Sequence, residues 1–277
     1  MSLMWKLLAT TLLLSSFAQA SVTGEKIENY LEDEFGTNSR IKSLNVKVIE
    51  EKPLPELKGW KSYVVEVEAY LKAKPKEKIN QRMIWFSNGV VIAKDLTRLD
   101  SGDSYVDIVK PTFQKAYYKK ENLVYGNPNA KHKVAIFSDP LCPFCKDFAP
   151  EALKYMKRHP NRFAVYYYHY PILRIHPASA IITRAAIVAE RKGIKDVSIK
   201  MYNTKVNPRE KNVSKILKAF NKAVGTDVTE REISDPSVNA QITSDEKIAK
   251  DLFVGGTPTI YFDGEMDKTR YKYKTAK

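Results

Sequence analysis

The stretch FSDPLCPFCKDF, residues 137–148, contains both cysteines of the 277-residue chain, Cys142 and Cys145. The apolar run before it predicts a buried strand, and the residues after it predict a helix. Cys142 would then stand at the start of the helix, where unpaired N–H groups and the positive end of the helix dipole stabilise a thiolate. We therefore predict that Cys142 is a nucleophile with a raised thiolate fraction at neutral pH.

Cys145 lies one helical turn further along, where we expect it to be buried and protonated. From that position it can attack a mixed disulfide formed on Cys142. An attacking sulfur and a resolving sulfur are what a dithiol exchange catalyst requires. We expect the intervening Pro143 and Phe144 to tune the redox potential. Unlike a histidine at that position, Phe144 offers the thiolate neither a hydrogen bond nor a charge, which predicts a less extreme oxidant than a histidine there would give.

Three other interpretations of the CPFC motif stay open: a structural disulfide, half of a metal site, and a chance occurrence. A metal site needs further ligands, and the four histidines (His132, His159, His169 and His176) are not paired at ligand spacing. Two cysteines are too few for a four-cysteine zinc ribbon or an iron–sulfur cluster. We therefore predict neither a metal nor a cofactor.

A second motif, GGTPTIYFDG, occupies residues 255–264. Its Thr257-Pro258 pair directly precedes a short apolar strand, and it resembles the cis-proline loop of thioredoxin-like proteins. Cis peptide bonds are almost confined to bonds that precede proline, so the residue type is suitable. An ordinary trans turn is the alternative.

Together, the two motifs resemble the DsbC/DsbG group of periplasmic thiol:disulfide interchange proteins. Asp139-Pro140 and Lys146 are most similar to the DsbG type. The resemblance implies that Cys142 is the nucleophile and Cys145 the resolving thiol, and that Thr257 and Pro258 contact the substrate. This sequence departs from many thioredoxins at Ile136, where they carry a buried acid, so that proton transfer at the buried thiol would need another route.

The same resemblance implies an α+β and α/β protein of two domains. A small cystatin-like domain, residues 21–105, would form a homodimer, and a linker helix, residues 106–125, would follow it. A thioredoxin-like catalytic domain, residues 126–277, would carry a helical insertion at about 177–253. The polar end of the chain leaves its last helix in doubt.

The residue pattern supports this division of the chain. A helical periodicity over 21–36 is followed by alternating segments, and Asn88-Gly89 between apolar runs is typical of a hairpin. We therefore expect one helix and an antiparallel meander in the first domain. Pro111 is well placed to begin the linker helix. From Lys131 onwards, strands alternate with helices, which favours an α/β domain.

Residues 1–20 have the features of a cleavable export signal: Lys6, a short apolar run, and Ala18-Gln19-Ala20 before the cut. We expect the mature protein in the periplasm, an oxidising compartment. The formal charge of +14 comes from lysines spread along the chain, with acidic residues between them. This pattern indicates a solvated basic surface, and we expect no nucleic-acid partner.

The predicted function is isomerisation or reduction of disulfides in unfolded or misoxidised exported proteins. This activity requires a DsbD-like membrane partner that keeps the dithiol reduced. One alternative is a dimeric dithiol oxidase served by a DsbB-like partner, and another is a holdase chaperone whose cysteines are secondary.

Overall fold

The computed structural model describes residues 21–277, so the predicted export signal at 1–20 lies outside the described residues. The chain divides into two compact units, one ending at Val109 and the other beginning at Lys110. Each unit has its own sheet and its own buried core. The two are described separately below.

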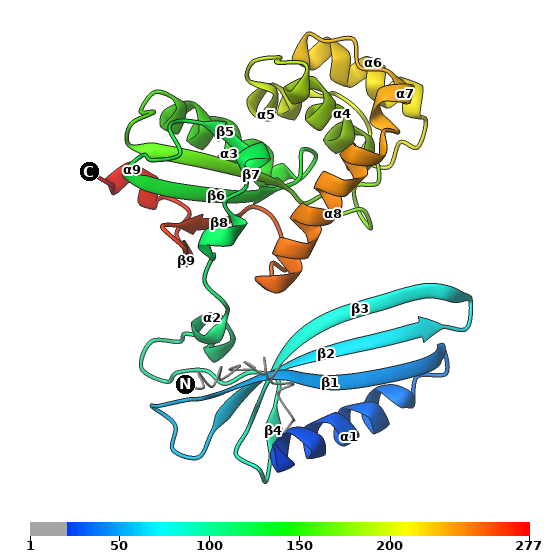
Figure 1. The fold of residues 1–277 in the computed structure, drawn as a ribbon, viewed down its shortest axis with the longest axis vertical. Coiled ribbons are helices and arrows are strands. Elements are labelled where there is room, and N and C mark those ends of the chain that lie inside the picture. Colours follow the sequence, from blue (N-terminus) through cyan, green and yellow to red (C-terminus); the bar gives the residue numbers. More distant parts are fainter. Residues whose placement is uncertain (1–20) are drawn as a thin grey trace, which may run out of the picture. The chain divides into compact units, whose positions relative to one another are not determined.

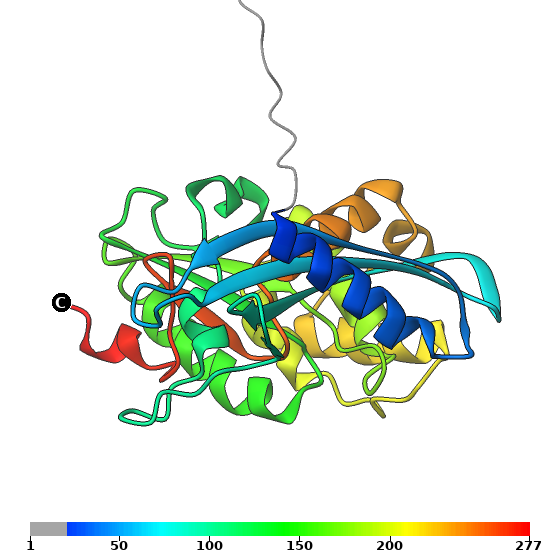
Figure 2. The same ribbon diagram turned by 90° about the horizontal axis from the view of Figure 1, so that it is seen from below.

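The first unit packs one helix on an antiparallel sheet. Helix α1 (Val22–Gly36) begins after Ser21, whose hydroxyl accepts a hydrogen bond from the Gly24 N–H. The sheet has the order β1-β2-β3-β4, with bounds Ile41–Pro53, Lys61–Leu71, Lys74–Ser87 and Ile92–Ala93. Helix α1 runs along one face of this sheet (Figure 2), where Ile27 and Leu31 join its core. The helix and the meander predicted for 21–105 are both formed.

The segment after this sheet corrects one prediction, because no single helix spans 106–125. Instead, α2 (Tyr105–Val109) is followed by two 3-10 turns, η1 (Lys115–Tyr117) and η2 (Lys120–Asn122). Pro111 disfavours a helical conformation at the residue before it, which ends α2. Beyond it, the Phe113 N–H donates to the Gly264 carbonyl at 2.7 Å, and the Phe113 ring packs among aromatic side chains. These tertiary contacts hold the segment outside a helix.

The second unit is built on a mixed five-stranded sheet of order β5-β7-β6-β8-β9. The strands span Leu123–Tyr125, His132–Ser138, Phe163–His169, Thr259–Phe262 and Glu265–Met266 in chain order. Strand β6 pairs in parallel with β7 and antiparallel with β8. Val134 and Ile136 enter one core, whereas Ala135 and Phe137 enter another. Both faces of the sheet are covered, which explains the unbroken apolar run in β6.

Helices fill the interval between β7 and β8, as predicted for about 177–253. They are α4 (Ser179–Arg191), α5 (Val197–Lys200), η3 (Met201–Asn203), α6 (Val213–Val224), α7 (Glu230–Ile233) and α8 (Pro236–Asp251). Helices α4 to α7 gather in one cluster (Figure 1), while Ile248 of α8 and Leu252, directly after α8, enter the core on the other face of the sheet. The mixed sheet and the predicted helical insertion are therefore both formed.

The last element is a short helix, α9 (Lys272–Thr275), at the position that the polar sequence left in doubt. Its Tyr273 is buried and lies edge-on to the rings of Phe148 and Tyr155. Both rings belong to α3 (Pro143–Lys157), the helix that follows the cysteine motif. This buried ring, the ion pair of Lys274 with Glu151 and the hydrogen bond from the Lys272 N–H to Asp267 together hold the basic end of the chain.

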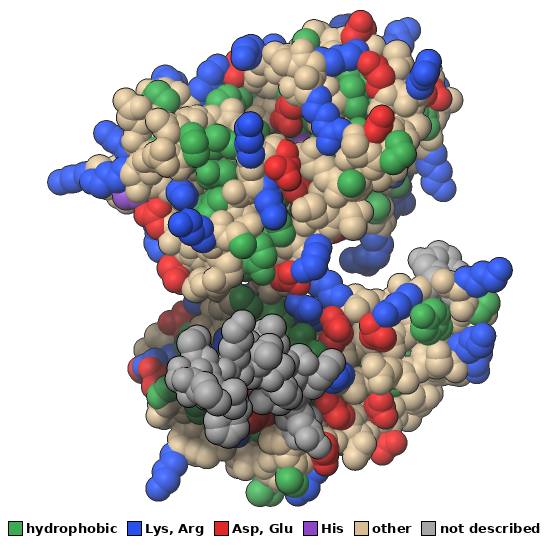
Figure 3. Space-filling model, viewed as in Figure 1, with side chains coloured by type: hydrophobic (Ala, Val, Ile, Leu, Met, Phe, Trp, Pro, Cys, Tyr) green, Lys and Arg blue, Asp and Glu red, His purple; other side chains and the backbone are tan. Residues whose placement is uncertain are grey.

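The surface of the described residues is basic without a concentrated patch on the face in view. Figure 3 shows Lys and Arg side chains scattered there, with Asp and Glu between them. This distribution agrees with a solvated basic surface. Within residues 21–277, no helix has the length and apolar character needed to cross a membrane.

Candidate functional site

The two cysteines occupy the first turn of α3. Cys142 is the residue that caps the helix, with an extended backbone, and Pro143 is the first helical residue. Proline suits this position because it has no N–H to leave unpaired and its φ is already helical. Cys142 retains 5% of its surface exposed, whereas Cys145 is fully buried. Both are free thiols. The predicted placement of an outer and an inner sulfur is therefore present.

The loop that carries Cys142 is held by the buried side chain of Asp139. Its Oδ1 atom accepts hydrogen bonds from the Leu141 N–H at 2.8 Å and the Ser179 hydroxyl at 2.6 Å. Its Oδ2 atom accepts from the Ile172 N–H at 2.8 Å and lies 2.9 Å from Nδ1 of His176. One carboxyl group thus joins the active-site loop, the loop after β7 and the start of α4.

The Thr257-Pro258 segment reaches the same place from the far end of the chain. The peptide bond between these two residues is cis, as the resemblance led us to expect. The Cys142 thiol donates to the Thr257 carbonyl with a sulfur–oxygen distance of 3.5 Å. The structure therefore brings together all four residues predicted as catalytic or substrate-binding: Cys142, Cys145, Thr257 and Pro258.

The surroundings of Cys145 differ sharply from those of Cys142. Burial raises the pKa of the Cys145 thiol well above its ordinary value, and hydrogen bonding by the Asp139 backbone and by the Ser138 and Thr257 hydroxyls lowers it in part. The inner sulfur therefore rests as a thiol. The outer sulfur has a helix N-terminus and a little exposure, so that an incoming disulfide meets Cys142 first.

Several large apolar side chains near the motif remain exposed. Phe144, directly before Cys145, is 69% exposed, and Leu173 and Ile175 are 47% and 41% exposed. The last two belong to the loop that Asp139 holds through Ile172. Pro143 and Phe144 thus lie on the surface beside Cys142, as their predicted tuning role requires.

A comparison with known protein families gives a match over the unit that contains this site. The family model described as Thioredoxin matches residues 118–277, more than half of the chain. The chain belongs to the thioredoxin family. Its two thiols, one at a helix N-terminus and one buried, make it a thioredoxin-like thiol:disulfide oxidoreductase.

Solved structures of thioredoxin-like proteins are similar to this chain at low identity. A thioredoxin-like oxidoreductase from Silicibacter pomeroyi is 22% identical, with a TM-score of 0.49, over 58% of this chain and 92% of the other. BdbD from Bacillus subtilis is 17% identical, with a TM-score of 0.46, over 60% and 92%. A periplasmic thioredoxin-like protein from Salmonella enterica is 18% identical, with a TM-score of 0.45, over 58% and 91%. The curated proteins contain no match.

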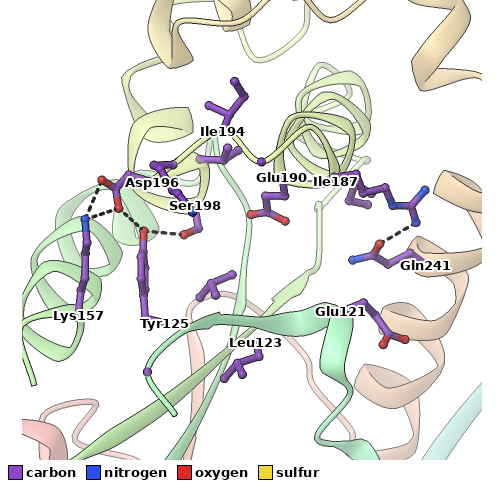
Figure 4. A pocket seen from close by; sticks show the side chains of 16 residues that line it. Glu121, Leu123, Tyr125, Lys157, Ile187, Glu190, Ile194, Asp196, Ser198 and Gln241 are labelled. Carbon is purple, nitrogen blue, oxygen red and sulfur yellow. Dashed lines mark hydrogen bonds and ion pairs between the residues drawn. The ribbon is translucent and has the colours of Figure 1, made fainter. Parts of the chain in front are cut away.

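The thioredoxin-like unit also holds a cavity of about 570 Å³ whose lining includes neither cysteine nor the Thr257-Pro258 loop. Tyr125, Lys157 and Gln241 line it, and Glu190 points into it (Figure 4). The Oε1 atom of Glu190 is buried and has no hydrogen-bond partner among the described residues. Burial raises the pKa of Glu190 to about 8. Because this cavity is lined by a largely protonated acid and by no sulfur atom, it is not the site of thiol exchange.

Sequence reasoning missed the residues that support the site. It used Asp139 only as a mark of resemblance and assigned no role to Ser138, His176 or Ser179. The polar pair Ser138-Asp139, directly after the apolar run of β6, was the signal that could have identified these two residues. Within the described residues, no cluster of His, Cys, Asp or Glu is arranged to hold a metal ion.

Proposed function

We propose that this thioredoxin-family protein is an exported disulfide isomerase and reductase of the DsbC/DsbG kind. Its substrates are exported proteins with incorrect disulfides. Cys142 attacks the client disulfide, and either a client thiol or Cys145 then resolves the mixed disulfide. Repeated action requires a reduced dithiol, so its electron source is a DsbD-like membrane reductase.

The contrast between the two sulfurs is the observation that carries this proposal. Cys142 caps α3 and lies 3.5 Å from the Thr257 carbonyl, while Cys145 is fully buried behind it. A client sulfur that approaches Cys142 also meets the backbone of the Thr257-Pro258 segment, which offers a carbonyl for main-chain hydrogen bonding. Recognition through main-chain groups does not depend on the client's sequence.

The exposed apolar side chains around the motif define the substrate class further. Phe144 lies two residues after the nucleophile, and Leu173 and Ile175 lie in the loop that Asp139 holds through Ile172; all three expose apolar surface. Unfolded and misoxidised chains expose apolar segments that native proteins hide. We therefore expect the enzyme to favour non-native clients over folded ones.

The redox state of the dithiol in the producing cells tests this function. Alkylation of free thiols immediately after acid quenching separates the reduced from the oxidised form on a gel. We expect a mainly reduced Cys142–Cys145 pair, and a Cys142→Ala variant provides the mobility standard for a single thiol. A mainly oxidised pair would contradict the isomerase and favour the dimeric oxidase with a DsbB-like partner.

A holdase chaperone is the alternative of a different class, and the exposed apolar side chains favour it as a second candidate. The Cys142→Ala, Cys145→Ala double variant separates the two functions. We expect it to lose protection of disulfide-containing clients in cells. Full protection by the double variant would show that binding, and not thiol exchange, is the main activity.

Export to the periplasm and dimerisation belong to the same proposal. The pattern of residues 1–20 supports export, and the separate unit of residues 21–109 supports a dimer built outside the catalytic unit. Sedimentation of the mature chain over a range of concentrations should give twice the monomer mass. A monomer at every concentration would exclude the dimer and leave the dithiol chemistry in place.

A further inference from the structure

Resolution of the mixed disulfide requires negative charge on a sulfur that is fully buried. Cys145 has no exposed surface, and Ile136 on the neighbouring strand β6 is equally buried and apolar. No carboxylate at position 136 is therefore available to take up the proton of Cys145. A buried anion is costly unless hydrogen-bond donors surround it. The donors around Cys145 thus decide how fast it can react.

Three hydroxyl groups form a continuous chain behind Cys145. Ser138, at the end of β6, interacts with the Cys145 sulfur and favours its thiolate. Its Oγ atom lies 2.6 Å from the Tyr202 hydroxyl, which lies 2.7 Å from the Tyr167 hydroxyl. All three side chains are buried. We call Ser138, Tyr202 and Tyr167 the hydroxyl chain.

These hydroxyl groups can all donate towards the sulfur. The Tyr167 hydroxyl lies 2.7 Å from the Tyr202 hydroxyl and also interacts with Ser138. If Tyr167 donates to Tyr202, Tyr202 donates to Ser138, and Ser138 donates to Cys145, then every hydroxyl hydrogen has an acceptor. In this arrangement the donors point towards the sulfur, and aligned donors strengthen one another.

Two further donors face the same sulfur. The hydroxyl oxygen of Thr257 is buried without a hydrogen-bond partner among the described residues, so that it can donate to a thiolate on Cys145, which it favours. The backbone of Asp139 acts in the same direction. Cys145 is therefore approached by donors from β6, from the loop after it and from the cis-proline segment.

We propose that the hydroxyl chain stabilises the thiolate of Cys145 during resolution, a role that the apolar side chain of Ile136 cannot fill. This inference rests on the dithiol chemistry proposed above. Cys145 loses its proton, and its sulfur attacks the Cys142 sulfur of the mixed disulfide. The Cys142–Cys145 disulfide forms while the bond to the client sulfur breaks. The client sulfur leaves with the electron pair and takes up a proton.

The proposal gives the helical insertion a part in the chemistry. Tyr202 belongs to η3, inside the insertion, whereas Ser138 and Tyr167 belong to neighbouring strands of the sheet. The insertion thus supplies the middle member of the hydroxyl chain. These residues are positioning residues, because Tyr202 and Tyr167 act on the sulfur through Ser138.

Stopped-flow reaction of the reduced mature protein with 5,5′-dithiobis(2-nitrobenzoate) tests the proposal, because it reports the two steps separately. Attack by Cys142 releases a first thionitrobenzoate, and resolution by Cys145 releases a second. We expect Ser138→Ala to slow the second release about 10- to 100-fold at neutral pH, the range for losing a hydrogen bond to a charged group. The first release should stay within about 2-fold of the wild-type rate, since the hydroxyl chain does not face Cys142.

The pH profile distinguishes stabilisation of an anion from a structural role. For Ser138→Ala, the rate of the second release should rise towards the wild-type rate as the pH is raised, because higher pH favours the thiolate without the hydroxyl. Tyr202→Phe keeps the ring and should slow the same step less, about 3- to 10-fold. Tyr125→Phe is the matched control, since its hydroxyl bonds Asp196 and Ser198 at the cavity.

The outcomes separate the two proposals. Absence of the first release in the wild type would refute the function itself. A normal first release with an unchanged second release in both Ser138→Ala and Tyr202→Phe would refute the hydroxyl chain alone. Equal slowing of both steps, or slowing that does not depend on pH, would also overturn it.

Discussion

Two acids of the thioredoxin-like unit, buried Asp139 and half-buried Glu190, show how surroundings decide the role of a carboxyl group. Asp139, at the active-site loop, has hydrogen-bond partners from three segments of the chain. Glu190, at the cavity, has an Oε1 atom without a partner among the described residues, and burial raises its pKa to about 8. The first acid organises the site, whereas the second stays largely protonated at neutral pH. Burial of a carboxyl group alone therefore does not identify an active site. The hydrogen-bond donors around the carboxyl group distinguish the two cases.

The largest expected effect is that of removing the acid at the active-site loop. Asp139→Ala leaves the N–H groups of Leu141 and Ile172 and the Ser179 hydroxyl without their acceptor. We expect the free energy of unfolding to fall by about 3–5 kcal/mol, because several buried donors lose their partner together. Urea unfolding of the mature protein measures this change.

Asp147→Ala is the matched control, because Asp147 lies exposed on the same helix as the cysteines. A surface substitution of this kind should change the free energy of unfolding by no more than about 0.5 kcal/mol. Equal effects of the two substitutions would show that Asp139 does not hold the loop.

The second effect concerns the acid at the cavity and depends on pH. Below about pH 4.5, the ordinary pKa, Glu190 is protonated in both the folded and the unfolded chain. As the pH rises towards 8, the unfolded chain releases this proton and the folded chain retains it, so that stability is lost with rising pH. Glu190→Gln removes this loss. Its free energy of unfolding relative to the wild type should increase by about 1–3 kcal/mol between pH 4 and pH 8.

Thermal or urea unfolding across this pH range gives the measurement. Glu230→Gln is the control, because Glu230 is exposed. This variant should show the same pH dependence of the free energy of unfolding as the wild type. If Glu190→Gln follows the wild-type curve at every pH, Glu190 is ionised in the folded protein and the contrast with Asp139 disappears.

The smallest effect on stability is expected for an ion pair in the lining of the cavity. Lys157 and Asp196 form an ion pair of 2.7 Å, and the Lys157 side chain is 46% exposed. Exposed pairs contribute about 0–1 kcal/mol, so that Lys157→Met should change the free energy of unfolding by no more than this. Both thionitrobenzoate releases should keep their rates. A slower release of thionitrobenzoate by this variant would show that the cavity influences the active site, and would contradict the comparison.

Local sequence patterns were sufficient for the elements that carry the cysteines. An apolar run followed by CPFC predicted a strand, a helix and an outer and an inner sulfur. The Thr257-Pro258 pair before a short strand predicted the cis-proline loop through its resemblance to thioredoxin-like proteins. These inferences succeeded because each depends on a few adjacent residues and on the ordinary geometry of a helix start or an X–Pro bond.

The supporting residues could not be predicted in this way, because they meet only through the tertiary fold. His176 reaches Asp139 across 37 positions, and Tyr202 reaches Ser138 across 64. The expected linker helix over 106–125 failed for the same reason. Its residues have helical potential, but Phe113 and its bond to Gly264 bind the segment to the sheet instead.

Trapping of the mixed disulfide tests the central claim, that Cys142 attacks and Cys145 resolves. Each reduced single-cysteine variant is mixed with an unfolded protein that retains a disulfide, quenched in acid and run on a non-reducing gel. The account predicts a covalent complex for Cys145→Ala, linked through Cys142, and little or none for Cys142→Ala. An equally strong complex through Cys145 in the Cys142→Ala variant would contradict it.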